Sequence, residues 1–333
     1  MRLHRFLIKC LLGVAAVAIL PRATFGWGDG GHMAIATRAW DEMTPETRVA
    51  AIQLLKQHPR YQADFGSKMP AGLSAEDQDL WLFAYAATWP DYVWRLKITS
   101  PRDFQKYYHG TWHTIGEPVA LDARLQDGMP VIPKSTSTVP DSLNIRDALP
   151  LVTKDLSDGS LSPGQRAVAL CWVMHLTGDL HEPCHSASLF SKRFSASDGD
   201  HVATRISAAA GEQKGGLHQY WDSLYCNNTK LDALKKWDQD QLANPVLQRS
   251  ALPQLLSHPT VDDWVAESFA IAKESVYDKD VRAALTEQDL DPTAAFKPIV
   301  LSEEYMAKAR EIGRQRGVLA GFRLADTLNQ AKW

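Results

Sequence analysis

The run from His175 to His185 (His-Leu-Thr-Gly-Asp-Leu-His-Glu-Pro-Cys-His) constrains the fold most, together with the segment His218-Gln-Tyr-Trp-Asp222. Each segment holds a His and an Asp four residues apart, which on a helix lie on one face, about 6 Å apart along the axis. Such a pair is either a surface salt bridge or two ligands aimed at one cation. Two pairs, with His185 following Asp179 so closely, favour the cation. Nitrogen and oxygen donors without paired cysteines are typical of zinc used for hydrolysis.

The charge of the chain is distributed unevenly. Four of its 36 Lys and Arg residues lie within the first 26 residues, which contain no acid, so the remainder carries 32 basic against 39 acidic residues. Broad binding of duplex nucleic acid draws on Lys and Arg contacts to phosphates. The acidic body of the chain argues against that mode of binding, and a metal cluster could supply positive charge locally instead.

Residues 1–26 have the composition of a secretory signal peptide. Arg2, His4, Arg5 and Lys9 form a charged start, and residues 11–20 form an apolar run too short to span a bilayer. Small residues at Thr24 and Gly26 precede a plausible cleavage point. We therefore expect a secreted protein (extracellular or periplasmic), without a membrane anchor, whose mature chain is 27–333.

The mature chain keeps three cysteines, Cys171, Cys184 and Cys226. In an oxidising compartment they leave room for one disulfide, and the sequence does not select the pair. Asn227-Asn-Thr229 fits the glycosylation sequon, which matters only in a host that glycosylates.

Apolar residues recur mainly at helical spacing. Ser162-Pro163 forms a helix start before an apolar run that reaches Leu176. Strand alternation is scarce, and 116–142 and 186–215 read as long loops because they are rich in turn-forming or small residues. The pattern predicts an all-α, single mainly helical domain over 27–333, built around a buried site. The other predicted helices are 33–54, 77–96, 149–156, 216–226, 230–243, 261–277 and 302–330.

Five motifs in the same order resemble the S1/P1 nuclease family. They are Trp27-x4-His32, Trp89-Pro-Asp91, Trp112-His113, His175-x3-Asp179-x5-His185 and Leu217-His218-x2-Trp221-Asp222. The resemblance covers most of 27–226. It implies a secreted, mainly helical enzyme of the phospholipase C/P1 nuclease type with a buried cluster of three zinc ions.

Carried over residue by residue, the resemblance implies a ligand set for each zinc ion. Asp179 would bridge the first two ions, one oxygen to each. His181, on the same segment, is expected to orient a ligand rather than bind metal itself. The implied ligands are Asp91, His113, His175 and Asp179 for the first ion; the α-amine and carbonyl of Trp27, His32 and Asp179 for the second; and His185, His218 and Asp222 for the third.

The chain departs from the family pattern around the substrate. Trp94 stands where the family usually has an arginine that contacts the scissile phosphate, and Arg95, which follows, can take that role. Thr114, Ile115 and Gly116 replace the aromatic and the polar residue that hold the base. A Gly-Gly-Asn segment of the family is here Gly199-Asp200-His201. The metal ligands are retained and the base pocket is not.

The sequence therefore predicts a secreted zinc-dependent phosphodiesterase. It is expected to cleave single-stranded DNA and RNA, and possible 3′-nucleotide substrates, to 5′-phosphate products, with Asp91 and Arg95 as catalytic residues, and to act as a monomer. Two alternatives stay open at this point: a zinc phospholipase C acting on phospholipid head groups, and a zinc-binding exported protein without catalysis.

Overall fold

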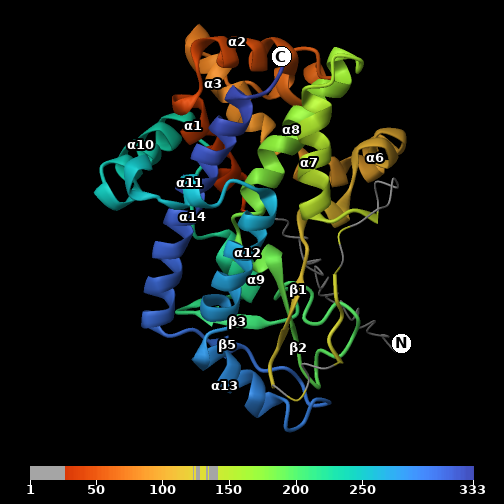
Figure 1. Cartoon of the computed structure of the whole chain (residues 1–333), viewed down its shortest axis with the longest axis vertical. Coiled ribbons are helices and arrows are strands. Elements are labelled where there is room, and N and C mark those ends of the chain that lie inside the picture. The colour runs from red at the N-terminus through yellow and green to blue at the C-terminus, as the bar shows by residue number, and fades with distance from the viewer. Residues whose placement is uncertain (1–26, 123, 125–127, 133, 135–141) are drawn as a thin grey trace, which may run out of the picture.

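The computed structural model describes residues 27–122, 124, 128–132, 134 and 142–333, so the expected signal peptide at 1–26 lies outside the described residues. The fold is mainly helical, as the sequence predicts (Figure 1). The longer helices are α1 (Asp29–Glu42), α2 (Pro45–Leu55), α3 (Ala75–Ala86), α6 (Pro101–Tyr107), α7 (Ile145–Leu156), α8 (Pro163–Asp179), α9 (Leu217–Asp222), α10 (Leu231–Leu242), α12 (Val261–Ile271), α13 (Lys279–Gln288) and α14 (Glu303–Asn329).

Short helices and helical turns connect these elements. They are α4 (Trp89–Tyr92), α5 (Leu96–Thr99), α11 (Gln254–Ser257), η1 (Tyr61–Phe65), η2 (Gly66–Lys68), η3 (Val93–Arg95), η4 (Gly110–His113), η7 (Pro183–Ser186), η8 (Pro245–Leu247), η9 (Arg249–Ala251) and η10 (Ala272–Val276).

Helix α8 runs through the middle of the molecule, with α7 beside it (Figure 1). Its start is the one predicted: Ser162 accepts a hydrogen bond from the backbone of Gln165, whose side chain accepts one from Ser162 in return. The second half of α8 is buried on every side, since it packs against α1, α2, α4, α7 and α14. A helix enclosed in this way can point polar side chains into a sheltered site.

Two helices predicted as continuous are interrupted near a proline. The predicted helix 33–54 is split into α1 and α2, and Thr44 caps the second piece by accepting from the backbone of Thr47. The predicted helix 77–96 ends at Ala86, and the chain restarts at α4. Proline has no N–H to donate, so Pro45 and Pro90 are tolerated in the first turn of a new helix rather than inside an old one. The second break puts Asp91 on a short helix of its own.

Short strands occur in both predicted loops. β1 (Glu117–Ala120) pairs in parallel with β2 (Ala187–Phe190), while β3 (Ser207–Ala210) pairs antiparallel with β4 (Gln213–Gly216) and in parallel with β5 (Ile299–Val300). Part of the 116–142 loop lies outside the described residues. Because β3 and β4 consist of Ser, Ala, Gln, Lys and Gly, they carry almost no apolar alternation that would reveal a strand.

Two hydrophobic clusters make up the core. The larger surrounds α8 and includes buried residues of α1, α3, α7 and α14; the smaller lies among β2, β3, α9, α13 and the start of α14. The chain passes from the larger to the smaller between Leu180 and Cys184. No helix in the described part of the chain is long and apolar enough to cross a membrane.

Helix α14 lies unusually close to its neighbours at two glycines. A Cβ atom on Gly317 would lie 2.4 Å from the ring of Tyr225, and one on Gly321 would lie 2.4 Å from the side chain of Arg38. Both positions therefore require glycine for the packing of α14 against α1 and the segment after α9.

Candidate metal centre

Asp179 lies at the end of α8 and is fully buried. One carboxylate oxygen, Oδ2, lies 2.9 Å from Nδ1 of His113 and 3.2 Å from Nε2 of His175. The other, Oδ1, lies 3.3 Å from Nε2 of His32. The two oxygens thus face different imidazoles, which is the arrangement a bridging carboxylate needs.

His175 is shared by two groups of potential ligands. Asp91 Oδ1 lies 3.4 Å from His175 Nε2 and 3.8 Å from His113 Nδ1. On the other side, the ring of His32 stacks on that of His175 with 3.9 Å between centroids. The first group, Asp91, His113 and His175, and the second group, His32, His175 and Asp179, therefore adjoin each other.

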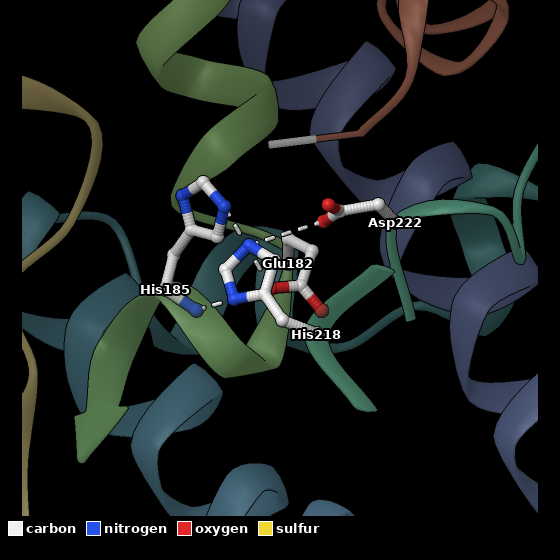
Figure 2. A group of neighbouring side chains, drawn as sticks. All are labelled: Glu182, His185, His218 and Asp222. Atoms are coloured by element: carbon white, nitrogen blue, oxygen red, sulfur yellow. Dashed lines mark hydrogen bonds and ion pairs between the residues drawn. The ribbon is translucent and has the colours of Figure 1, made fainter. Parts of the chain in front are cut away.

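A third group consists of Glu182, His185, His218 and Asp222, whose ligand atoms lie within 4.8 Å of one another. Figure 2 shows the four side chains converging from the segment after α8 and from α9. His218 and Asp222 lie one turn apart, with 3.5 Å between Nε2 and Oδ1. Glu182 is not among the residues predicted from the sequence, although it lies three residues before His185 in the run that predicts the site.

Backbone carbonyls fix the orientation of three of these imidazoles. The Nδ1–H of His175 donates to Ala87 O at 2.8 Å, that of His185 to His113 O at 2.6 Å, and that of His218 to Val202 O at 2.5 Å. Each bond assigns the proton to Nδ1 and leaves the Nε2 lone pair facing the group. These rings are thereby set in the form in which imidazole binds a metal.

The carbonyl that orients His218 comes from a strained loop. His201, Val202 and Ala203 have φ angles of 55°, 51° and 65°, a left-handed conformation that is costly above all for a β-branched residue. Buried Asp200 holds this loop: its carboxylate accepts from the backbone N–H groups of Leu189 and Ala203, both at 3.0 Å, and from the Tyr277 hydroxyl at 2.8 Å.

The electrostatics of the third group reflect its burial. Burial lowers the pKa of His185 to about 3 and that of His218 to about 4, so both rings are neutral near pH 7. Burial also raises the pKa of Glu182 to about 8 and, together with the charges of Glu182 and Asp179, raises the pKa of Asp222 well above its ordinary value. Within the described residues, neither carboxyl group of this group forms an ion pair with a Lys or Arg; each lies near a histidine instead.

The donor atoms fit a metal because the protein leaves them without partners. Buried polar atoms are nearly always hydrogen-bonded, and each exception calls for an explanation. Nitrogen and carboxylate oxygen donors suit zinc. The atoms that make no hydrogen bond within the described residues include Nε2 of His32, His185 and His218, Oδ1 of Asp91 and Asp179, Oε1 of Glu182, and both carboxylate oxygens of Asp222.

Comparison with known families agrees with this geometry. The family model described as S1/P1 Nuclease matches residues 27–332. The chain belongs to the S1/P1 nuclease family. Membership supports a hydrolase that acts on phosphodiester bonds, and candidate metal sites of the type described above accord with a family that generally depends on zinc.

A second similarity is local. Over 99 residues the chain is 31% identical to the ribonucleoside-diphosphate reductase subunit beta of Enterobacteria phage T4, a match that covers 29% of this chain and 24% of that protein. The chain thus spans about a quarter of the length of that relative, and the match carries no assignment of family or function.

Trp27, the first residue of the S1/P1 nuclease match, lies beside the site. It is fully buried, and its indole N–H donates to Gly178 O at 3.0 Å. The backbone N–H of the next residue, Gly28, donates to Asp222 O at 3.2 Å. These contacts hold the expected mature start between the ends of α8 and α9.

Arg95 does not join the three groups. It is exposed on η3, and its guanidinium lies over the ring of Tyr92, 5.3 Å from the centroid. Trp94, in the place of the usual family arginine, is 40% exposed.

His181 has different partners from those expected of a residue that orients a ligand. Its Nδ1 donates to Thr177 O at 2.7 Å, and its Nε2 accepts from Arg323 at 2.8 Å. Burial, followed by the charges of Arg316 and Arg323, lowers the pKa of His181 well below its ordinary value. His181 thus belongs to a cluster with Glu267, Arg316 and Arg323, termed here the arginine network.

The cysteines form no disulfide among the described residues. Cys171, Cys184 and Cys226 are all free and buried. Burial raises the pKa of each thiol, which keeps it protonated and unreactive. The sequence left room for a disulfide because side-chain separation cannot be read from cysteine count.

A cavity of about 1000 Å³ adjoins the third group, with His185 and His218 in its wall. Thr114 and Ile115, which replace the usual base-holding residues of the family, also line it. Its aromatic side chains come from the α6 segment instead. Phe104 and Tyr108 stack on each other there, with 4.7 Å between centroids.

Proposed function

We propose that the chain is a secreted, zinc-dependent phosphodiesterase and endonuclease that cleaves single-stranded DNA and RNA, and 3′-nucleotides, to products carrying a 5′-phosphate. The observation that carries the proposal is the convergence of ligand-type side chains from α1, α4, η4, α8, η7 and α9 on three adjoining buried groups. Many of their donor atoms, including Nε2 of His185 and His218, make no hydrogen bond within the described residues. The chain's membership of a nuclease family supports phosphodiester hydrolysis as the reaction at these groups.

Three zinc ions are proposed, with Asp179 shared between two of them. The separate directions of its carboxylate oxygens, toward His32 and toward His113 and His175, support that sharing. The proposed ligands are Asp91, His113, His175 and Asp179; Trp27 through its amine and carbonyl, His32 and Asp179; and His185, His218 and Asp222.

Bound zinc supplies Lewis acidity toward phosphate oxygens and a nucleophile at neutral pH. The chain's own contribution begins with Asp91, which is the most exposed of the proposed carboxylate ligands, with 16% of its side chain accessible. Its Oδ1 makes no hydrogen bond within the described residues. We assign Asp91 the role of orienting the attacking water and holding its proton.

The cavity beside the third group suits a flexible single strand. Bases of single-stranded nucleic acid stack on aromatic side chains irrespective of sequence, and Phe104 and Tyr108 offer such rings. The acidic body of the chain, with 39 Asp and Glu residues, disfavours a broad grip on duplex phosphates.

Arg95 is proposed to contact the scissile phosphate in place of the family arginine. Its exposed guanidinium lies over the Tyr92 ring and forms no ion pair with a carboxylate within the described residues, so it is available to a phosphate. Arg95→Ala should lower kcat/KM about tenfold or more, in keeping with a charge-assisted hydrogen bond of about 1.5–3 kcal/mol. Lys97→Ala, which removes another exposed cation nearby, is the matched control.

The decisive experiment compares substrates for the mature protein beginning at Trp27. Release of 5′-nucleotides from single-stranded DNA and RNA is expected, with slower cleavage of duplex DNA, and metal analysis should find about three zinc ions per chain. Release of phosphocholine from lecithin without nucleotide release would replace the proposal by a phospholipase C. Zinc binding without either activity would indicate a non-catalytic protein.

The proposed boundary between the signal peptide and the mature domain can be tested at the N-terminus of the exported protein. We propose that 1–26 is removed on secretion and that 27–333 acts as one monomeric domain. Sequencing the N-terminus of the exported protein should give Trp27. A version with Met ahead of Trp27 should lose most activity because the α-amine is displaced, whereas full activity would remove Trp27 from the ligand set.

A further inference from the structure

Glu182 is a buried acid that the family resemblance does not assign to metal. It precedes η7 and has no exposed side-chain surface. In Figure 2 its carboxylate lies beside the rings of His185 and His218, with Asp222 completing the group. A carboxylate in this position requires a physical explanation, because a buried carboxyl is costly unless it is paired.

Capping of η7 accounts for one of its two oxygens. Glu182 Oε2 accepts from the backbone N–H of His185 at 3.0 Å, and the same oxygen lies 3.9 Å from His185 Nε2. A glutamine at this position would cap the turn equally well, since its amide oxygen accepts the same bond. Capping therefore does not explain why this position has a carboxyl group rather than an amide.

The second oxygen takes no part in this cap. Glu182 Oε1 is buried and makes no hydrogen bond within the described residues. The same holds for Nε2 of His185, Nε2 of His218 and both oxygens of Asp222. In both rings Nδ1 donates to a backbone carbonyl, so the lone pair of Nε2 faces this group. A cation can contact several such acceptors at once, whereas a hydrogen-bond donor from a single side chain cannot satisfy them all.

We propose that Glu182 is a fourth protein donor to a divalent cation held with His185, His218 and Asp222. The inference rests on the metal centre proposed above and extends its third site. Two imidazoles with two carboxylates neutralise a doubly charged ion, whereas the three-ligand set leaves one net positive charge. The fourth donor therefore tightens the hold on the ion and reduces the ion's pull on substrate phosphate.

The test uses Glu182→Gln in the mature protein, because glutamine keeps the shape and the cap but removes the charge. Zinc content and affinity are measured by competition with a chromogenic chelator. We expect two ions to bind as in the wild type and the third to bind about 100-fold or more weakly, since loss of a supporting group alone costs about 10–100-fold. Glu212→Gln, which alters an exposed acid in the turn between β3 and β4, should change no affinity.

Folding is checked separately by melting both variants in excess EDTA, where an intact cap predicts a midpoint no lower than that of the wild type. If Glu182→Gln holds three ions with wild-type affinity, Glu182 is not a donor and only this inference fails. If the wild type itself holds no more than two ions, the three-ion centre of the proposed function fails, and the assignment of Glu182 fails with it.

Discussion

Two buried polar clusters take up adjacent residues of the segment that follows α8, and they balance charge in different ways. The arginine network receives His181 and the metal centre receives the adjacent Glu182. In the network, Glu267 accepts from Arg316 at 2.6 Å and from Arg323 at 2.7 and 2.8 Å. The protein supplies both signs of charge there.

The metal centre supplies one sign. Its carboxylates, on Asp91, Asp179, Glu182 and Asp222, face imidazoles, and no Lys or Arg forms an ion pair with them within the described residues. In the arginine network, the protein itself neutralises the buried carboxylate. In the metal centre, that neutralisation is left to a bound ion. The stability contributed by the metal centre should therefore depend on bound metal, whereas that contributed by the arginine network should not.

Removal of metal should have the largest effect on activity and stability, and it should act through the metal centre alone. An ion present at a thousandfold excess over its Kd stabilises the folded state by about 4 kcal/mol, and three such ions by about 12 kcal/mol. Dialysis against a chelator should therefore abolish hydrolysis and lower Tm by more than about 10 °C, and added zinc should restore both. Calorimetry with and without chelator measures the effect; an unchanged Tm would mean that the protein itself compensates the buried donors.

Glu267→Gln should produce the next largest effect, from the opposite cluster. Arg316 and Arg323 are each 3% exposed, and removing their shared carboxylate leaves two buried cations. We expect a loss of about 3 kcal/mol in the free energy of unfolding, with zinc content and the activity of the folded fraction retained. Urea denaturation with a parallel metal assay measures both, and the exposed Glu274→Gln is the control.

The same variant tests the pH dependence of the network. Although burial opposes it, the hydrogen bonds and charges of Arg323 and Arg316 lower the pKa of Glu267 to about 2, from an ordinary value of 4.5. The stabilisation is complete above pH 4.5 and is lost as the pH falls toward 2. Wild type and variant should thus converge in stability only at about pH 2 and below. A constant difference across that range would contradict the assignment.

Tyr277→Phe should have the smallest effect, and that effect should be confined to the third site of the metal centre. The hydroxyl of Tyr277 donates to Asp200, which holds the strained loop whose Val202 carbonyl orients His218. Loss of one buried hydrogen bond costs about 1 kcal/mol of stability. Zinc affinity of the third site should fall up to about tenfold while the first two ions are unaffected. An equal loss at all three sites would show that the loop acts on the whole fold.

Elements with strong local signals were predictable. The capped start of α8 and the span of α14 follow from sequence because caps and long apolar periodicity act locally. The His-x3-Asp pairs likewise fix their own geometry, since four residues make about one helical turn. The roles of the proposed ligands and of Arg95 stay predictions.

Other features depend on contacts that sequence order does not contain. His181 and Glu182 are adjacent polar residues with nothing in their spacing to say which turns toward the metal centre. The carbonyls of Ala87, His113 and Val202 orient ligands, yet a carbonyl is present in every residue. The short strands in 186–215 were missed for a related reason: small residues are placed there by their neighbours rather than by their own preferences.

The close contact at Gly317 and Gly321 bears on the order in which the protein is made. Every proposed ligand has left the ribosome before Glu303, the first residue of α14, is synthesised. Yet α14 covers the helix that carries His32 and packs against α8. The nascent chain therefore exposes its histidines and carboxylates before it can enclose them. We therefore expect assembly of the centre to be a late event of folding, in which α14, which contributes no ligand, closes over the helices that do.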